Sequence, residues 1–182
     1  MILYEYPKVE KLQDGSKIEI RPLRKEDEKI LHEHFVRLPP EDRLCLYNVT
    51  DPKVIKKWIL DLNYDEMLPL VAVDTDRIVA YVTLQFDPIG WTKHQGKIRI
   101  TSDREYRRKG LATILIENLI QIAVDFDLEQ LTAEICPVLD EAYFLFEKLG
   151  FKQAAVFKDF IMDLDNNYED LVLMVKDISS YQ

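Results

Sequence analysis

The sequence is short of the features that mark several classes of protein. Its 182 residues include two cysteines, Cys45 and Cys136, without CxxC spacing or a nearby histidine cluster, so no metal site is expected. Two isolated cysteines also fit a reducing compartment. No basic, apolar leader opens the chain, and its most apolar stretch, Leu111 to Val124, is broken by polar residues and too short to span a bilayer. These absences predict a cytoplasmic protein without a membrane span.

Basic residues are in the minority. The chain has 24 lysines and arginines against 33 aspartates and glutamates, a formal charge of −9. Phosphate backbones bind to basic faces, so nucleic acid is not the expected partner, whereas a cationic acceptor would be attracted. With 47% apolar and 31% charged residues and no linker or repeat, the composition predicts one globular domain over residues 1–182.

The order of the predicted elements favours a mixed sheet. Strands are expected at 17–21, 68–73, 77–86, 97–102 and 131–136, with two more between 151 and 178, and helices at 26–37, from 53, at 110–126 and at 140–149. The strand–helix–strand unit implies a parallel pair with a right-handed crossover, and the hairpins at both ends imply antiparallel pairs. The predicted fold class is α/β (α+β), a mostly antiparallel mixed sheet flanked by helices.

The junction before the long helix has an unusual charge for so acidic a chain. Four of the six residues from Arg104 to Lys109 are basic, and Gly110 and Ala112 follow where the helix begins. A helix N-terminus presents unpaired N–H groups and the positive end of its dipole, and so it binds anions. The pattern indicates a phosphate-binding loop, although a solvated basic turn with a glycine for geometry would have the same composition.

The spacing of these residues, Arg107-x-x-Gly110-x-Ala112, resembles the pyrophosphate motif of the GNAT acetyltransferases. Downstream, residues 142–151 are similar to that family's helix against the cofactor, which ends in Gly-Phe. The resemblance implies the GNAT fold with a splayed parallel strand pair, and acetyl-CoA (coenzyme A) as cofactor. It also implies an N-acetyltransferase that moves the acetyl group directly to a primary amine.

The front of the chain narrows the resemblance. Residues 20–27 are similar to the family's opening strand and first helix, and together with residues 38–43 they look most like the acetyltransferase domains of bacterial protein-lysine acetyltransferases. This subfamily implies a protein lysine as the acceptor, with a small amine as the other candidate. The chain is expected to be a monomer or a homodimer.

The resemblance also assigns residues to the cofactor. They come from the strand before the loop, the loop with the first helical turn, and the later helix: Ile100, Thr101, Ser102, Arg107, Arg108, Lys109, Gly110, Leu111, Ala112, Thr113 and Phe146. Pantetheine would pass between the strands at 97–102 and 131–136, and its amides would pair with their backbones.

The transfer needs a base, because an alkyl ammonium has a pKa of about 10.4. The family's glutamate on the strand before the loop is replaced here by Lys97, whereas its alternative, on the strand after the long helix, is present as Glu134. A carboxylate in an otherwise apolar strand is costly unless it has a role or a partner. We therefore predict that Glu134 is the general base. A strand-end glutamate that faces solvent or pairs with an arginine is the alternative.

The general acid is less clearly marked. Phe146 replaces the family's usual tyrosine and Leu139 its frequent asparagine. Tyr143, one helical turn earlier, could protonate the leaving thiolate, unless it is simply a core residue. An active enzyme and a non-catalytic acetyl-CoA-binding module for sensing or regulation are therefore both open. A nucleotide-binding domain is disfavoured, because no Walker pattern is present.

The last hairpin is rich in acidic residues, namely Asp159, Asp163, Asp165, Glu169 and Asp170. They hint at a cationic acceptor, such as a polyamine or a protein lysine. A solvated turn is the alternative explanation.

Overall fold

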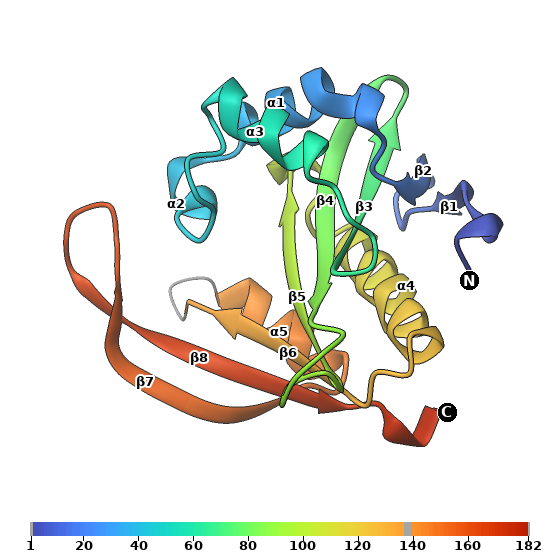
Figure 1. The fold of residues 1–182 in the computed structure, drawn as a ribbon. Coiled ribbons are helices and arrows are strands. Elements are labelled where there is room, and N and C mark those ends of the chain that lie inside the picture. The colour runs from blue at the N-terminus through green and yellow to red at the C-terminus, as the bar shows by residue number, and fades with distance from the viewer. Residues whose placement is uncertain (1, 137–139, 182) are drawn as a thin grey trace. The chain divides into compact units, whose positions relative to one another are not determined.

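The chain is described here by a computed structural model that covers residues 2–136 and 140–181 (Figure 1). It folds into two compact units, each assembled from segments that are distant in sequence. Unit 1 contains Met1–Thr83 and Ile100–Leu115, and unit 2 contains Leu84–Arg99 and Ile116–Gln182. The expectation of one domain over the whole chain stays a prediction.

Eight strands are found among the described residues, in the sheet order β1-β2-β3-β4-β5-β6-β8-β7. They are β1 (Lys8–Lys11), β2 (Lys17–Pro22), β3 (Met67–Asp74), β4 (Arg77–Phe86), β5 (Gln95–Ser102), β6 (Gln130–Ile135), β7 (Lys152–Met162) and β8 (Tyr168–Asp177). β5 and β6 pair in parallel, whereas β1–β2, β2–β3, β6–β8 and β7–β8 pair antiparallel. The predicted fold class, a mostly antiparallel mixed sheet with one parallel pair, is confirmed.

The described helices follow the predicted order. They are α1 (Glu28–Arg37), α2 (Pro40–Arg43), α3 (Pro52–Leu60), α4 (Leu111–Asp125) and α5 (Asp140–Lys148), with 3₁₀-helices η1 (Ile2–Glu5), η2 (Lys25–Asp27), η3 (Arg104–Tyr106) and η4 (Ser179–Tyr181). Asp51 caps α3, because its side chain accepts a hydrogen bond from the amide of Lys53 at 2.9 Å. In the part of the chain that the structure covers, no helix is long and apolar enough to cross a membrane. The sequence prediction missed β1, α2 and the 3₁₀-helices.

The apolar core of unit 1 holds α1 and α3 over two strands. It is built from residues spaced one turn apart on each helix and from buried residues of β3 and β4: Leu31, Phe35, Ile55, Ile59, Val71, Val73, Ile78 and Tyr81. The ring of Phe35 packs edge-on against Tyr81, with centroids 5.3 Å apart, and against Trp58 at 6.0 Å. This packing fixes the rotation of α1 and so determines which of its polar residues point inward.

Unit 2 is organised around β6. Its register with β5 runs from Gln95↔Gln130 to Ile98↔Ala133, and its register with β8 runs from Gln130↔Asp177 to Ile135↔Val172. Leu131, Ala133 and Ile135 are buried, whereas the residues between them are more exposed, so one face of β6 is covered. β5 itself continues to Ser102, beyond its paired residues.

Gly96 is the point of closest packing in unit 2, and it offers a test of this core. A Cβ at this position would lie 2.6 Å from Leu84, 3.0 Å from Leu131 and 3.1 Å from Leu128. All three leucines are buried, so the extra methyl group would overpack the core. We expect Gly96→Ala to lower the free energy of unfolding by about 1–3 kcal/mol. Urea denaturation of the variant and the wild type measures this, and equal midpoints would contradict the packing.

Candidate functional site

A tight turn and a helix N-terminus form the predicted phosphate-binding loop. After β5 ends at Ser102, the backbone passes through Arg108 and Gly110, whose φ angles are 59° and 84°. The amide of Ile114 donates to the carbonyl of Gly110 at 3.1 Å, so Gly110 is the first residue to accept a helical hydrogen bond in α4. The amides of the first turn, which begins at Leu111, have no acceptor within the helix and are oriented to bind an anion.

Gly110 lies against the turn between β1 and β2. The amide of Gln13 donates to the carbonyl of Lys109 at 3.0 Å, and a Cβ at residue 110 would lie 3.3 Å from the Gln13 side chain. A larger residue would therefore meet Gln13 and would also strain the backbone, whose φ is +84°. Local geometry thus accounts for the glycine of the motif.

Basic side chains of the loop are paired with carboxylates of the same unit. The pairs are Arg107 with Asp42, Arg104 with Glu41 at 2.6 Å, and Lys109 with Asp14 at 2.9 Å. Hydrogen bonds from Ser16 and Lys109 hold the pKa of Asp14 well below its usual range. An incoming phosphate would have to compete with these carboxylates for the same cations.

The pair of Arg107 and Asp42 gives a testable consequence. The side chain of Asp42 is 11% exposed and its charge lies beside the loop. Asp42→Asn removes a repulsion worth up to about 1 kcal/mol, so we expect coenzyme A to bind up to about fivefold more tightly. Titration calorimetry measures the affinity, with Glu41→Gln as a control for the more exposed neighbouring pair. Weaker binding by the Asp42 variant would show that this carboxylate supports the loop rather than competing with the ligand.

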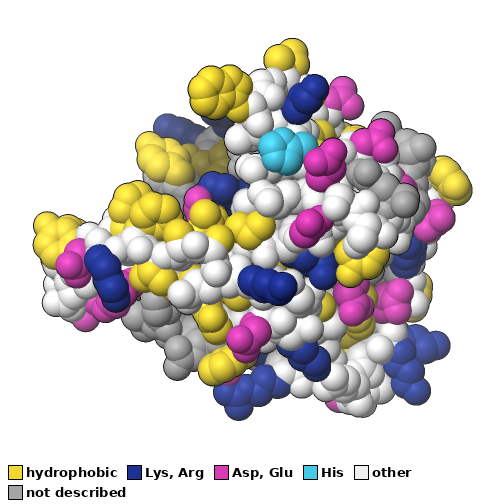
Figure 2. All heavy atoms as spheres, turned by 90° about the horizontal axis from the view of Figure 1, so that it is seen from below, with side chains coloured by type: hydrophobic (Ala, Val, Ile, Leu, Met, Phe, Trp, Pro, Cys, Tyr) yellow, Lys and Arg dark blue, Asp and Glu magenta, His cyan; other side chains and the backbone are white. Residues whose placement is uncertain are grey.

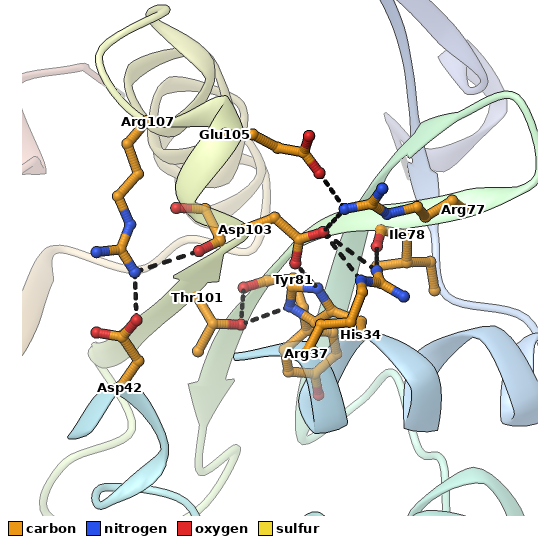
Figure 3. A network of polar contacts seen from close by, with 11 residues as sticks. His34, Arg37, Asp42, Arg77, Ile78, Tyr81, Thr101, Asp103, Glu105 and Arg107 are labelled. Carbon is orange, nitrogen blue, oxygen red and sulfur yellow. Dashed lines mark hydrogen bonds and ion pairs between the residues drawn. The ribbon is translucent and has the colours of Figure 1, made fainter. Parts of the chain in front are cut away.

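A buried polar network holds the end of β5 (Figure 3). His34 of α1 is fully buried, with Nδ1 2.9 Å from Oδ1 of Asp103 and Nε2 3.0 Å from Oγ1 of Thr101. The other oxygen of Asp103 accepts from Arg37 at 3.2 Å and from Arg77 at 2.6 Å. Thr101 was expected from the sequence, but His34 and Asp103 were missed. The sequence around a helical histidine gives no sign of a partner 67 residues away.

Glu134, the predicted base, extends from β6 toward two basic residues of β5. Its Oε1 lies 2.6 Å from Nζ of Lys97, and its Oε2 lies 3.6 Å from a guanidinium nitrogen of Arg99. The three side chains are between 32% and 42% exposed, so the cluster faces solvent. Glu134 thus has the partners that the alternative interpretation expected, and its catalytic role stays a prediction.

Tyr143, the predicted acid, lies on the other side of the unit 2 sheet from Glu134. It lines a shallow pocket of about 360 Å³ together with Met174 and residues of β7. Met174 pairs with Ala133, whereas Glu134 pairs with Leu173. Because paired residues share a face and successive residues alternate, Met174 and Glu134 belong to opposite faces. An acid on α5 and a base on β6 would therefore approach the reacting atoms from different sides.

The other predicted site residues are placed as follows. Thr101 and Leu111 are buried, Arg108 is exposed, and Ile100, Ser102, Ala112 and Thr113 are half-buried. Phe146 is buried on α5 with its ring edge-on to Phe151, so it belongs to the core. Leu139 lies outside the described residues. Within residues 2–136 and 140–181, no cluster of three or more histidine, cysteine or acidic residues could hold a metal ion.

The acidic residues of the last hairpin are partly engaged in its own structure. The carboxylate of Asp163 accepts from the amides of Asp165 and Asn167, and Asp170 pairs with Lys158 at 2.5 Å. Large apolar side chains are exposed between them, namely Val156, Phe157, Phe160, Met162, Leu164 and Tyr168. Figure 2 shows hydrophobic side chains gathered at the left, where Figure 1 places this hairpin. Apolar and charged groups are therefore interleaved on its surface.

Comparison with known proteins agrees with these features. The model of the acetyltransferase (GNAT) family matches residues 28–151. An N-alpha-acetyltransferase of Saccharolobus solfataricus is 37% identical over 65 residues, which are 35% of this chain and 39% of the relative. The match thus spans well under two thirds of that protein.

Solved structures share the fold. The ribosomal-protein-S5-alanine acetyltransferase of Vibrio fischeri superposes with a TM-score of 0.76 at 19% identity, over 91% of this chain and 95% of the other. The GNAT domain of PAT from S. lividans superposes with a TM-score of 0.76 at 17% identity, over 94% and 96% of the two chains. Since the family match covers more than half of its length, the chain belongs to the GNAT acetyltransferase family.

Proposed function

We propose that the chain is an N-acetyltransferase that moves an acetyl group directly from acetyl-CoA to a primary amine. The observation that carries the proposal is the start of α4, where Arg108 and Gly110, both with positive φ, turn the chain into the N-terminus of the helix. In a member of the GNAT family, such an N-terminus with basic neighbours suits the pyrophosphate of coenzyme A.

The residues present fit this cofactor. Amides of Leu111, Ala112 and Thr113 would bind the pyrophosphate, with Arg107, Arg108 and Lys109 adding charge. The register of β5 with β6 ends at Ile98, which leaves the backbone of Ile100 to Ser102 for the amides of pantetheine.

Acetyl-CoA supplies an activated acyl group as a thioester, and the chain has to supply a neutral amine. We propose that Glu134 accepts the proton of the acceptor ammonium, directly or through a water molecule. Lys97 and Arg99 hold its carboxylate on the exposed face of β6, within reach of solvent. Tyr143 is proposed to protonate the leaving thiolate from the side of α5.

The acceptor is proposed to be a primary amine on a protein or a small molecule. One similar protein is named an N-alpha-acetyltransferase and one similar structure a ribosomal-protein-S5-alanine acetyltransferase, and α-amines of peptides are therefore proposed as the first candidates. Lysine peptides remain candidates through the resemblance of the front of the chain to protein-lysine acetyltransferases. The mixed apolar and acidic hairpin is compatible with a cationic polypeptide.

Acetyl-CoA turnover is the direct test. We expect thiol release at about 1 s⁻¹ or faster with at least one member of a panel of N-terminal peptides, lysine peptides, polyamines and aminoglycosides. Calorimetry with coenzyme A runs in parallel. Binding without turnover on any amine would contradict the enzyme and favour a sensing module, for which Phe146 in place of an acidic hydroxyl already provides a reason.

The role of Glu134 predicts a specific pH dependence. Glu134→Gln should lower kcat/KM by about 10²–10³ at pH 7, and the loss should shrink as the pH approaches the ammonium pKa of about 10.4, where the amine is already neutral. Glu129→Gln, at an exposed residue of the same unit, is the matched control. A loss that stayed constant across the pH range would mean that Glu134 orients groups rather than accepting a proton.

A further inference from the structure

His34 is buried far more completely than its place on a surface helix requires. Its side chain is fully inaccessible, and both ring nitrogens have polar partners, Asp103 and Thr101. Phe35 follows it in the apolar cluster, so the same rotation of α1 that buries Phe35 also turns His34 toward β5. The two hydrogen bonds, of 2.9 Å and 3.0 Å, satisfy both ring nitrogens and join α1 to two residues at the end of β5.

The protonation state of the ring follows from its surroundings. Burial lowers the pKa of His34 and outweighs the opposing effect of Asp103, and Arg37 and Arg77 lower it further. Burial alone would raise the pKa of Asp103, but hydrogen bonds from His34 and Arg77 dominate and hold it below its usual value. An ionised carboxylate only accepts hydrogen bonds, so the neutral ring carries its proton on Nδ1. Nε2 then accepts from the hydroxyl of Thr101.

This arrangement fixes the hydroxyl of Thr101. Its hydrogen is directed to His34, and its only other described acceptor, the carbonyl of Tyr81, lies farther away at 3.5 Å. Asp103, two residues on, is held by its side chain and also by its amide, which donates to the carbonyl of Val79 at 2.9 Å. Hydrogen bonds therefore hold the backbone between Thr101 and Asp103 at both ends.

We propose that His34 is a positioning residue, which sets the conformation of the end of β5 through the hydroxyl of Thr101 and so tunes the binding of coenzyme A. The inference rests on the proposed function, which assigns Ile100 to Ser102 to the cofactor. Ser102 lies between Thr101 and Asp103. Its carbonyl accepts a hydrogen bond from Arg107 at 3.4 Å, which connects the network to the loop. His34 acts through Thr101 and touches no reacting atom.

Two substitutions break the contact from opposite sides. Thr101→Val removes the hydroxyl and keeps the branched side chain, whereas His34→Asn keeps a polar group near Asp103 but is too short to reach Thr101. We expect each to weaken the affinity for coenzyme A about tenfold by calorimetry. The double variant should lose no more than either single variant, because both remove the same contact. Thr101→Ser, which keeps the hydroxyl, should bind within about threefold of the wild type.

His32→Asn is the matched control, because His32 lies on the same helix but bonds to the carbonyl of Thr50 instead. It should leave the affinity unchanged. Variants that melt earlier but bind coenzyme A as the wild type does, at a temperature below their transitions, would overturn the inference and leave His34 a structural residue. Wild-type protein that binds no coenzyme A would instead overturn the proposed function, and the inference with it.

A second measurement needs no variant. The chain has three histidines, so ¹⁵N spectra of the imidazole rings resolve His34 individually. The expected state is a neutral ring protonated on Nδ1, with a resonance that moves when coenzyme A is added. A ring protonated on both nitrogens at neutral pH, or one that does not respond to coenzyme A, would contradict the inference.

Discussion

The buried carboxylate of Asp103 is the charge on which the polar interior of unit 1 depends. It is 5% exposed and binds His34, Arg37 and Arg77, so it joins α1, the beginning of β4 and the end of β5. A buried charge is costly unless it is paired, and removing one partner of such a set leaves the others uncompensated. Because the pKa of both Asp103 and His34 is lowered, protonation of either opposes folding. The contribution of His34 is thus complete above its ordinary pKa of 6.5 and declines as the pH falls through it.

The charge distribution around the loop follows from the same need for pairing. In a chain with a net charge of −9, the basic residues before α4 attract nearby carboxylates. They form ion pairs with Asp14, Glu41 and Asp42. The main-chain amides of the first helical turn are different, because carboxylate side chains do not neutralise a helix dipole unless they cap it. The helix N-terminus thus still attracts an anion, although carboxylates neutralise the charges of the basic side chains around it.

The sequence was sufficient for features that depend on neighbouring residues. The strand and helix periods and the glycine at the start of α4 have local causes, and the structure agrees with them. β1 and α2 were missed because each has only four residues, too few for a period to appear. The partners of His34, and Lys97 as the nearest partner of Glu134, could not be predicted, because they depend on which strands are adjacent and on the rotation of α1.

Lys97 and Glu134 illustrate why such a pair should be interpreted together. The resemblance placed a glutamate at residue 97, and the lysine found there looked like the loss of a base. In the parallel register, however, residue 97 stands opposite Thr132, and the Lys97 ammonium lies 2.6 Å from Glu134. Two carboxylates at these positions would repel each other across adjacent strands. A carboxylate at residue 134 therefore favours a cation at residue 97, so Lys97 is consistent with the family's alternative glutamate position on β6.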